Sequence, residues 1–109
     1  MQVRSKVMGK YYIYIIRCEG DELYTGITGD VEKRFNEHLS GKGAKYTKSH
    51  RPKNIEAYWS TNEKGKALKL EFRIKQLTKE EKELLIQDNI YFKKYFKGLL
   101  DLRFYRRCK

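Results

Sequence analysis

The chain has 109 residues, a length that fits one domain with one modest core. Its hydrophobic fraction of 39% excludes a disordered chain, and its charged fraction of 36% indicates a heavily charged surface. Lys and Arg number 25 against 14 Asp and Glu, so the net charge is +11, and a polyanion is the first partner to consider.

The apolar runs are too short for a membrane-spanning helix, which needs about 18–20 residues. The longest candidate, Tyr11 to Ile16, has the length of a buried strand. No signal-peptide hydrophobic region follows the basic residues near the start, so we expect a soluble, cytoplasmic protein without membrane contact. Cys18 and Cys108 have no CxxC spacing, and we expect two reduced thiols rather than a disulfide or a zinc site.

The first predicted elements are two strands. Tyr11–Cys18 and Leu23–Thr28 are rich in β-branched and aromatic residues, and the turn-forming Glu19-Gly20-Asp21 separates them. This close spacing predicts an antiparallel hairpin. Gly26 lies inside the second strand, where glycine indicates a bulge or a close approach of another group to the backbone.

Helices and one more strand follow. Asp30 is a candidate N-cap and Gly41 a stop for a helix over Val31–Ser40. Ile55–Ser60 reads as a third strand, and a helix is expected over Glu63–Leu77. The remaining predictions are a capping box of Thr78 and Glu81 opening a helix through Gln87, and a last helix whose apolar pairs recur every four residues, at Tyr91/Phe92, Tyr95/Phe96 and Leu99/Leu100.

These elements predict an α+β fold, with a small three-stranded, mainly antiparallel sheet flanked by helices. We expect a single domain over residues 1–109, with a core of about 10–86 and a helical C-terminal extension over 87–109. The extension is either an amphipathic helix docked on the domain, which we favour, or a wider basic surface for nucleic acid. We assume a monomer.

The Val31–Ser40 helix carries a candidate polar pair. Val31, Phe35 and Leu39 form its predicted buried stripe, and Arg34 and His38 lie one turn apart on one flank. Both can reach toward the sheet. The alternative is a solvated arginine and a helix-end histidine.

Glu71 on the Glu63–Leu77 helix is a second candidate. It falls between an apolar strip that includes Leu70 and Ile74 and a second strip of Leu68 and Phe72. A carboxylate so placed is expected to be partly buried and to need a partner. An ion pair with Lys75, one turn on, and coordination of Mg²⁺ or Mn²⁺ are both open.

Five short motifs, taken in order, resemble the GIY-YIG endonuclease superfamily. They are Tyr12-Ile13-Tyr14, Tyr24-Thr25-Gly26, the run from Asp30 to His38 that contains Arg34, the segment from Gly41 to Thr47, and the string from Glu71 to Lys75. Tyr12 stands where the first motif has glycine, and Thr25 where the second has isoleucine. The likeness covers about residues 10–86 and is strongest to a branch of small stand-alone bacterial members.

The resemblance implies a catalytic group of Tyr14, Tyr24, Arg34, His38 and Glu71 that hydrolyses phosphodiester bonds. Glu71 would hold one divalent ion, Mg²⁺ or Mn²⁺, and Arg34 would contact the phosphate. One of the two tyrosines would help to deprotonate the attacking water, with Tyr14 favoured and Tyr24 open. Taken singly, hairpin tyrosines are more often packing residues.

Basic residues between the first helix and the third strand suit backbone phosphates of the substrate. Residues 39–54 hold five basic and no acidic side chains, and residues 89–109 hold seven basic residues and one acidic. We expect the substrate to be DNA rather than RNA, contacted by Lys42, Lys45, Tyr46, Lys48, Arg51 and Lys75, with Tyr46 stacking on a base or packing in the core.

Two other functions compete with the nuclease. One is a DNA- or RNA-binding module on a nuclease-like scaffold without turnover. The other is a basic protein of a ribonucleoprotein assembly, which predicts binding that does not depend on a divalent metal.

Overall fold

The computed structural model describes residues 10–109, and it begins with the predicted hairpin. Strand β1 (Tyr11–Cys18) pairs antiparallel with β2 (Leu23–Thr28) through the turn, in which Asp21 has a positive φ of 74°. Tyr12 lies in regular register with Thr28 and with the neighbouring third strand. The tyrosine that replaces the motif glycine therefore leaves the strand undistorted at this point.

In the described part of the chain the sheet has four strands, in the order β2-β1-β3-β4, so the prediction of three was wrong. Strand β3 (Pro52–Thr61) is longer than the predicted Ile55–Ser60 and begins with proline, a position at which the missing N–H is tolerated. Strand β4 (Arg106–Arg107) adds to its outer edge. Two consecutive arginines have no apolar alternation, so a sequence pattern cannot predict this strand. The α+β class with an antiparallel sheet flanked by helices is confirmed.

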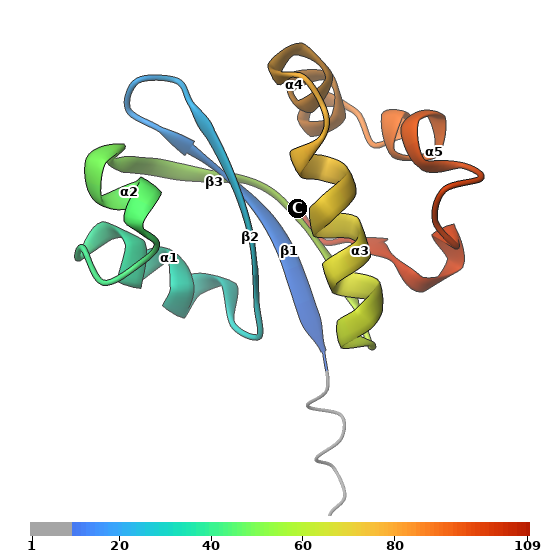
Figure 1. Cartoon of the computed structure of the whole chain (residues 1–109), viewed down its shortest axis with the longest axis horizontal. Coiled ribbons are helices and arrows are strands. Elements are labelled where there is room, and N and C mark those ends of the chain that lie inside the picture. The colour runs from blue at the N-terminus through green and yellow to red at the C-terminus, as the bar shows by residue number, and fades with distance from the viewer. Residues whose placement is uncertain (1–9) are drawn as a thin grey trace, which may run out of the picture.

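Within residues 10–109, five α-helices flank the sheet, α1 and α2 on one side and α3, α4 and α5 on the other (Figure 1). Helix α1 (Val31–Leu39) begins at the predicted cap, where the Asp30 side chain accepts a hydrogen bond from the Lys33 N–H at 3.1 Å. The short helix α2 (Lys45–Ser49) follows. It was not predicted, since five residues carry too little periodicity.

The helices on the other side of the sheet lie where they were predicted, but α3 and α5 end earlier in the chain than predicted. Helix α3 spans Lys64–Lys75, and α4 spans Lys79–Gln87 behind the predicted capping box of Thr78 and Glu81. Helix α5 (Ile90–Phe96) stops before Leu99, because Gly98 has a positive φ of 85°, and a short 3₁₀ turn (Leu102–Phe104) leads to β4.

The core lies between the sheet and α3–α5. Alternate residues of β1 and β3 contribute to it, together with one face of α3 and the inner faces of α4 and α5; its members are Ile13, Ile15, Ala57, Trp59, Ala67, Leu70, Ile74, Leu85, Phe92 and Phe96. The burial of Phe92 and Phe96 confirms that the C-terminal helix is docked on the domain. Both cysteines are free thiols, Cys18 buried and Cys108 exposed.

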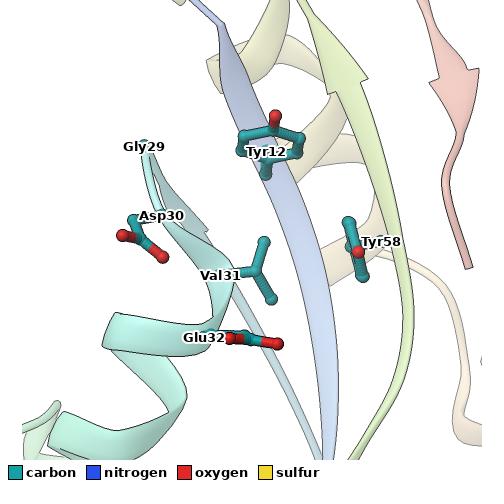
Figure 2. A pocket seen from close by; sticks show the side chains of 6 residues that line it. All are labelled: Tyr12, Gly29, Asp30, Val31, Glu32 and Tyr58. Carbon is teal, nitrogen blue, oxygen red and sulfur yellow. The ribbon is translucent and has the colours of Figure 1, made fainter.

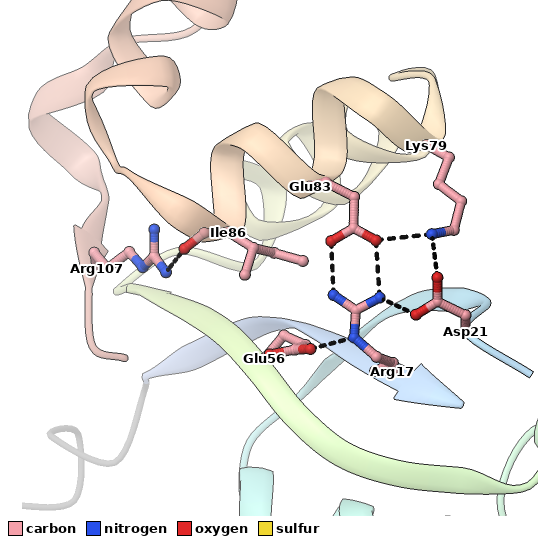
Figure 3. A network of polar contacts seen from close by, with 7 residues as sticks. All are labelled: Arg17, Asp21, Glu56, Lys79, Glu83, Ile86 and Arg107. Carbon is pink, nitrogen blue, oxygen red and sulfur yellow. Dashed lines mark hydrogen bonds and ion pairs between the residues drawn. The ribbon is translucent and has the colours of Figure 1, made fainter. Parts of the chain in front are cut away.

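A partly buried network of ion pairs joins α4 to the hairpin (Figure 3). The guanidinium of Arg17 contacts both carboxylate oxygens of Glu83, at 2.6 and 2.8 Å, as well as Asp21 at 2.6 Å and Glu56. Lys79 bonds to Glu83 at 2.7 Å and to Asp21 at 3.1 Å. The hydrogen bonds from Arg17 lower the pKa of Glu83 to about 2, against the effect of burial. This network fixes the start of α4 to the end of β1.

In the part of the chain that the structure describes, no helix is long and apolar enough to cross a membrane.

Candidate active site

Tyr14 and His38 form the centre of the candidate site. Tyr14 points from β1 toward α1, and its hydroxyl lies 2.9 Å from His38 Nε2. Both side chains are buried, with 2% and 1% exposed. The expectation that Val31, Phe35 and Leu39 form the buried stripe of α1 was therefore wrong in part, because Val31 and His38 are its buried residues and the other two are half-buried.

Two glycines make the room for this pair. A Cβ on Gly26, which lies opposite Tyr14 in the hairpin, would fall against the Tyr14 hydroxyl and 2.5 Å from its Cζ. A Cβ on Gly43 would fall against His38 Nδ1 and 2.8 Å from its Cγ. The close approach predicted at Gly26 is confirmed, and the approaching group is the ring of Tyr14.

The hydrogen bonds around His38 define its tautomer. The Thr47 hydroxyl donates to the Ala44 carbonyl at 2.9 Å, so its oxygen is left to accept from His38 Nδ1–H at 2.7 Å. His38 Nε2 is then unprotonated and accepts from the Tyr14 hydroxyl. The Ala44 N–H lies 3.4 Å from Nδ1 and would favour the other tautomer, but that contact is much longer than the two bonds that oppose it.

The environment keeps both groups neutral. Burial raises the pKa of Tyr14 to about 12, an effect that the nearby Arg34 opposes and the negative charge of Glu71 adds to. Burial, and then the positive charge of Arg34, lower the pKa of His38. At neutral pH the Tyr14 phenol is therefore protonated, and it donates a hydrogen bond to the unprotonated Nε2 of a neutral His38 imidazole.

Arg34 and Glu71 lie on different helices, α1 and α3. Arg34 extends from α1, is about one-third exposed, and is held by Glu37 at 3.0 Å. Glu71 extends from α3, and its carboxylate is 17% exposed and paired with Lys75 at 3.2 Å. The charges of both groups affect the pKa of Tyr14, which Arg34 lowers and Glu71, with the smaller effect, raises.

Tyr24 continues the site as the first member of an aromatic series. Its ring centroid lies 5.4 Å from His38 and 6.3 Å from Tyr14. Tyr46 stacks on Tyr24 at 5.7 Å, and His50 stacks on Tyr46 at 3.9 Å with the planes only 7° apart. Tyr46 is 38% exposed, which excludes the predicted alternative that it packs in the core.

The predicted phosphate contacts are exposed around α2. Lys42, Lys45, Lys48 and Arg51 all lie at the surface. A hollow of about 420 Å³ opens beside them, and His38, Thr47, Lys48 and Arg51 line part of it. Lys75 lies apart from this group, on α3 beside Glu71. The sequence interpretation did not single out Gly43 and Thr47, although both fall in the Gly41–Thr47 segment that carried the resemblance.

A second hollow of about 350 Å³ lies at the start of α1 (Figure 2). Tyr12 and Tyr58 form one wall, with their ring centroids 5.9 Å apart at 76°, and Val31 points between them in the figure. Asp30 and Glu32 line the opposite wall. No predicted site residue lines this hollow.

Comparison with known proteins places the chain in a family. Residues 10–84 match the model of the GIY-YIG catalytic domain. A UPF0213 protein of Cupriavidus necator is 50% identical over 72 residues, which cover 66% of this chain and 78% of that one. The UPF0213 protein YhbQ of Escherichia coli O157:H7 is 39% identical over 92 residues, 84% of this chain and 92% of that one.

A solved relative is the UPF0213 protein BH0048 from Bacillus halodurans, whose solution NMR structure is 40% identical in sequence, with a TM-score of 0.48 over 72% of this chain and 83% of that one. The family model covers well over half of the chain, and it spans β1, β2, α1 and α3, the elements that carry Tyr14, Tyr24, Arg34, His38 and Glu71. The chain therefore belongs to the GIY-YIG family, among relatives named UPF0213 proteins.

Proposed function

We propose that the protein is a metal-dependent endonuclease that hydrolyses phosphodiester bonds of DNA, including branched or otherwise structured DNA. The observation that carries this proposal is the set of groups around one phenol. The Tyr14 hydroxyl bonds to the free nitrogen of His38, and the charges of Arg34 and Glu71 both act on it. Phosphodiester hydrolysis needs this combination, a route for the proton of water, a cation for phosphate and a carboxylate for a metal ion.

Tyr14 and His38 would move the proton together. With a pKa of about 12, Tyr14 is almost entirely protonated at neutral pH and is a poor base alone. Its hydroxyl oxygen accepts a proton from the attacking water while its own proton passes to His38 Nε2. Thr47 holds the imidazole in the tautomer that this transfer requires. Tyr24 lies near enough to assist, and it remains the second candidate for the base.

Arg34 and Glu71 would act on the phosphate. The planar guanidinium of Arg34 suits two phosphate oxygens at once, and Glu37 orients it. Among residues 10–109 no three His, Cys, Asp or Glu side chains gather as a metal site. Glu71 would thus be a sole protein ligand, an arrangement that Mg²⁺ accepts because it keeps several waters and binds substrate phosphate. When bound, the ion supplies charge neutralisation at the leaving oxygen.

The ion pair of Glu71 with Lys75 favours one alternative. Lys75 stands 3.2 Å from the oxygen that would bind metal, so in this arrangement the site resembles that of a non-catalytic DNA- or RNA-binding module. An (i, i+4) pair with Lys75 half-exposed is worth only about 0.3–0.5 kcal/mol, so a divalent ion and a phosphate can displace it readily.

A cleavage panel separates the two functions. Nicked, branched, flapped and single-stranded DNA and RNA are incubated with the protein in Mg²⁺, in Mn²⁺ and in chelator. The nuclease predicts metal-dependent products that disappear in Glu71→Gln while binding remains. Glu80→Gln, the same change at an exposed carboxylate of α4, is the matched control and should retain cleavage. Binding without products from any substrate would establish the binding module, and cleavage that survives Glu71→Gln would remove Glu71 from the mechanism.

A further inference from the structure

Helix α3 exposes two large apolar side chains beside Glu71. Phe72 is 58% exposed and Leu68 is 47% exposed, although the sequence pattern grouped them as an apolar strip. Leu70 and Ile74, on another face of the helix, are fully buried in the core. Phe72 and Leu68 are four residues apart and so adjacent on the helix surface; we call them the α3 ridge.

Glu71 lies between the ridge and the core. It precedes Phe72 by one residue and follows Leu68 by three, so at about 100° per residue its side chain falls on the flank shared with Leu68. The carboxylate is 17% exposed, intermediate between the buried face and the ridge. Any phosphate brought to Glu71 therefore has an adjoining nucleotide within reach of the ridge.

The charge of α3 selects the partner of the ridge. The helix carries one acidic residue, Glu71, and five basic ones, Lys64, Lys66, Lys69, Arg73 and Lys75. A polyanion is the complementary partner, and it must also present apolar surface. A stacked duplex conceals the faces of its bases, whereas an unpaired base exposes one to aromatic and aliphatic side chains. Two side chains are too small an apolar face for a membrane-bound helix.

We propose that the α3 ridge stacks against an unpaired base next to the phosphate bound at Glu71, so that the site prefers single-stranded or locally unpaired nucleic acid. Phe72 supplies the flat stacking surface, with the Arg73 guanidinium 5.8 Å from its ring centroid, and Leu68 packs against the edge of the base. This inference rests on the proposed binding of nucleic acid at the site, and it makes the ridge the element that distinguishes open from paired substrates.

The test measures stacking without cleavage. A single-stranded oligonucleotide containing 2-aminopurine is titrated with protein in Ca²⁺ in place of Mg²⁺, and the same sequence is titrated as a full duplex. Wild-type protein should bind the single strand more tightly than the duplex and should quench 2-aminopurine. Phe72→Ala should weaken single-strand binding by about 5-fold or more and remove the quenching, while duplex binding changes by less than about 2-fold. Leu68→Ala should act in the same direction with a smaller loss.

Ile90→Ala is the matched control, because Ile90 is 67% exposed on α5, a different helix, and the substitution should change neither measurement. Equal losses for single strand and duplex in Phe72→Ala, or no loss in either, would overturn the inference. The inference would also be overturned if sedimentation showed that the ridge mediates dimer formation. Binding of the ridge to phosphatidylserine vesicles, with no effect of its substitution on single-strand binding, would overturn it as well.

The same variants separate this inference from the proposed nuclease. Quenching that depends on Phe72, in a protein that yields no metal-dependent products, would retain the ridge and reject the nuclease. Cleavage of open and paired substrates at wild-type rates in Phe72→Ala would retain the nuclease and reject the ridge.

Discussion

Gly26→Ala tests whether the position of the Tyr14 hydroxyl matters. The new Cβ would lie 2.5 Å from Tyr14 Cζ, whereas ordinary contacts begin at 3.4 Å, so the ring must move by about 0.9 Å. Tyr14 is 2% exposed, and its hydroxyl is held at 2.9 Å from His38 Nε2. A shift of that size either lengthens this bond beyond hydrogen-bonding range or pushes the imidazole away.

Both stability and activity should respond. Overpacking a closed site costs about 1–3 kcal/mol of the free energy of unfolding. Displacement of a reacting group by about 1 Å can lower the rate by about 10²-fold, with little effect on substrate binding through the exposed lysines. The backbone itself tolerates alanine here, because positive φ among the described glycines is confined to Gly41 and Gly98.

The measurements are thermal unfolding, the ¹⁵N shifts of the His38 ring, and metal-dependent cleavage by Gly26→Ala. Gly29→Ala is the control, since a Cβ at that position meets nothing within 4 Å and should leave all three near wild type. If Gly26→Ala keeps the wild-type melting temperature and the wild-type ring shifts, the packing of Tyr14 against Gly26 does not position the pair, and the reasoning fails.

Three more predictions concern charge. Lys45→Ala or Lys48→Ala should lower the slope of log affinity against log salt by about one each if each lysine contacts a phosphate, measured by anisotropy across a salt series; an unchanged slope would remove that lysine from the interface. Arg17→Leu should lower the free energy of unfolding by about 2 kcal/mol at pH 7. This difference from wild type should shrink as the pH falls from about 4.5 toward 2, because Glu83 then takes up its proton. Chemical denaturation at each pH measures the difference. Above pH 10 the unfolded chain releases the Tyr14 proton before the folded protein does. The free energy of unfolding of wild type should therefore fall by about 1 kcal/mol by pH 11 relative to that of Tyr14→Phe. An equal decline in both proteins would argue against a raised pKa of Tyr14.

Local patterns in the sequence predicted the parts of the fold that local physics determines. Asp30 caps α1, and Thr78 with Glu81 caps α4, because a cap is a contact between residues three apart. Strand β4 could not be predicted from a local pattern, because it pairs with Trp59 and Ser60, more than forty residues away in the sequence. The α3 ridge shows the same limit, since periodicity identifies an apolar face but not whether another element covers it.

The candidate site was predictable in its members and not in its geometry. The resemblance supplied Tyr14, His38 and Glu71, and the cap at Asp30 with the stop at Gly41 predicted the helix that carries Arg34 and His38. No spacing shows that the Tyr14 hydroxyl meets His38 Nε2 across 24 residues of sequence. That contact depends on Gly26 and Gly43, whose function is the absence of a side chain.

The C-terminal segment completes this arrangement from outside the family-matched residues 10–84. Arg107 donates to the carbonyls of Leu85 and Ile86 at 2.8 and 2.7 Å, so it closes the end of α4, as Figure 3 shows for Ile86. Tyr105 donates to the Lys66 carbonyl at 2.8 Å and so holds the first turn of α3. Because α3 carries Glu71, the distance from that carboxylate to Tyr14 depends on how firmly α3 is held against the sheet. The extension therefore acts on the candidate site through the helix that it supports, although none of its residues lies in that site.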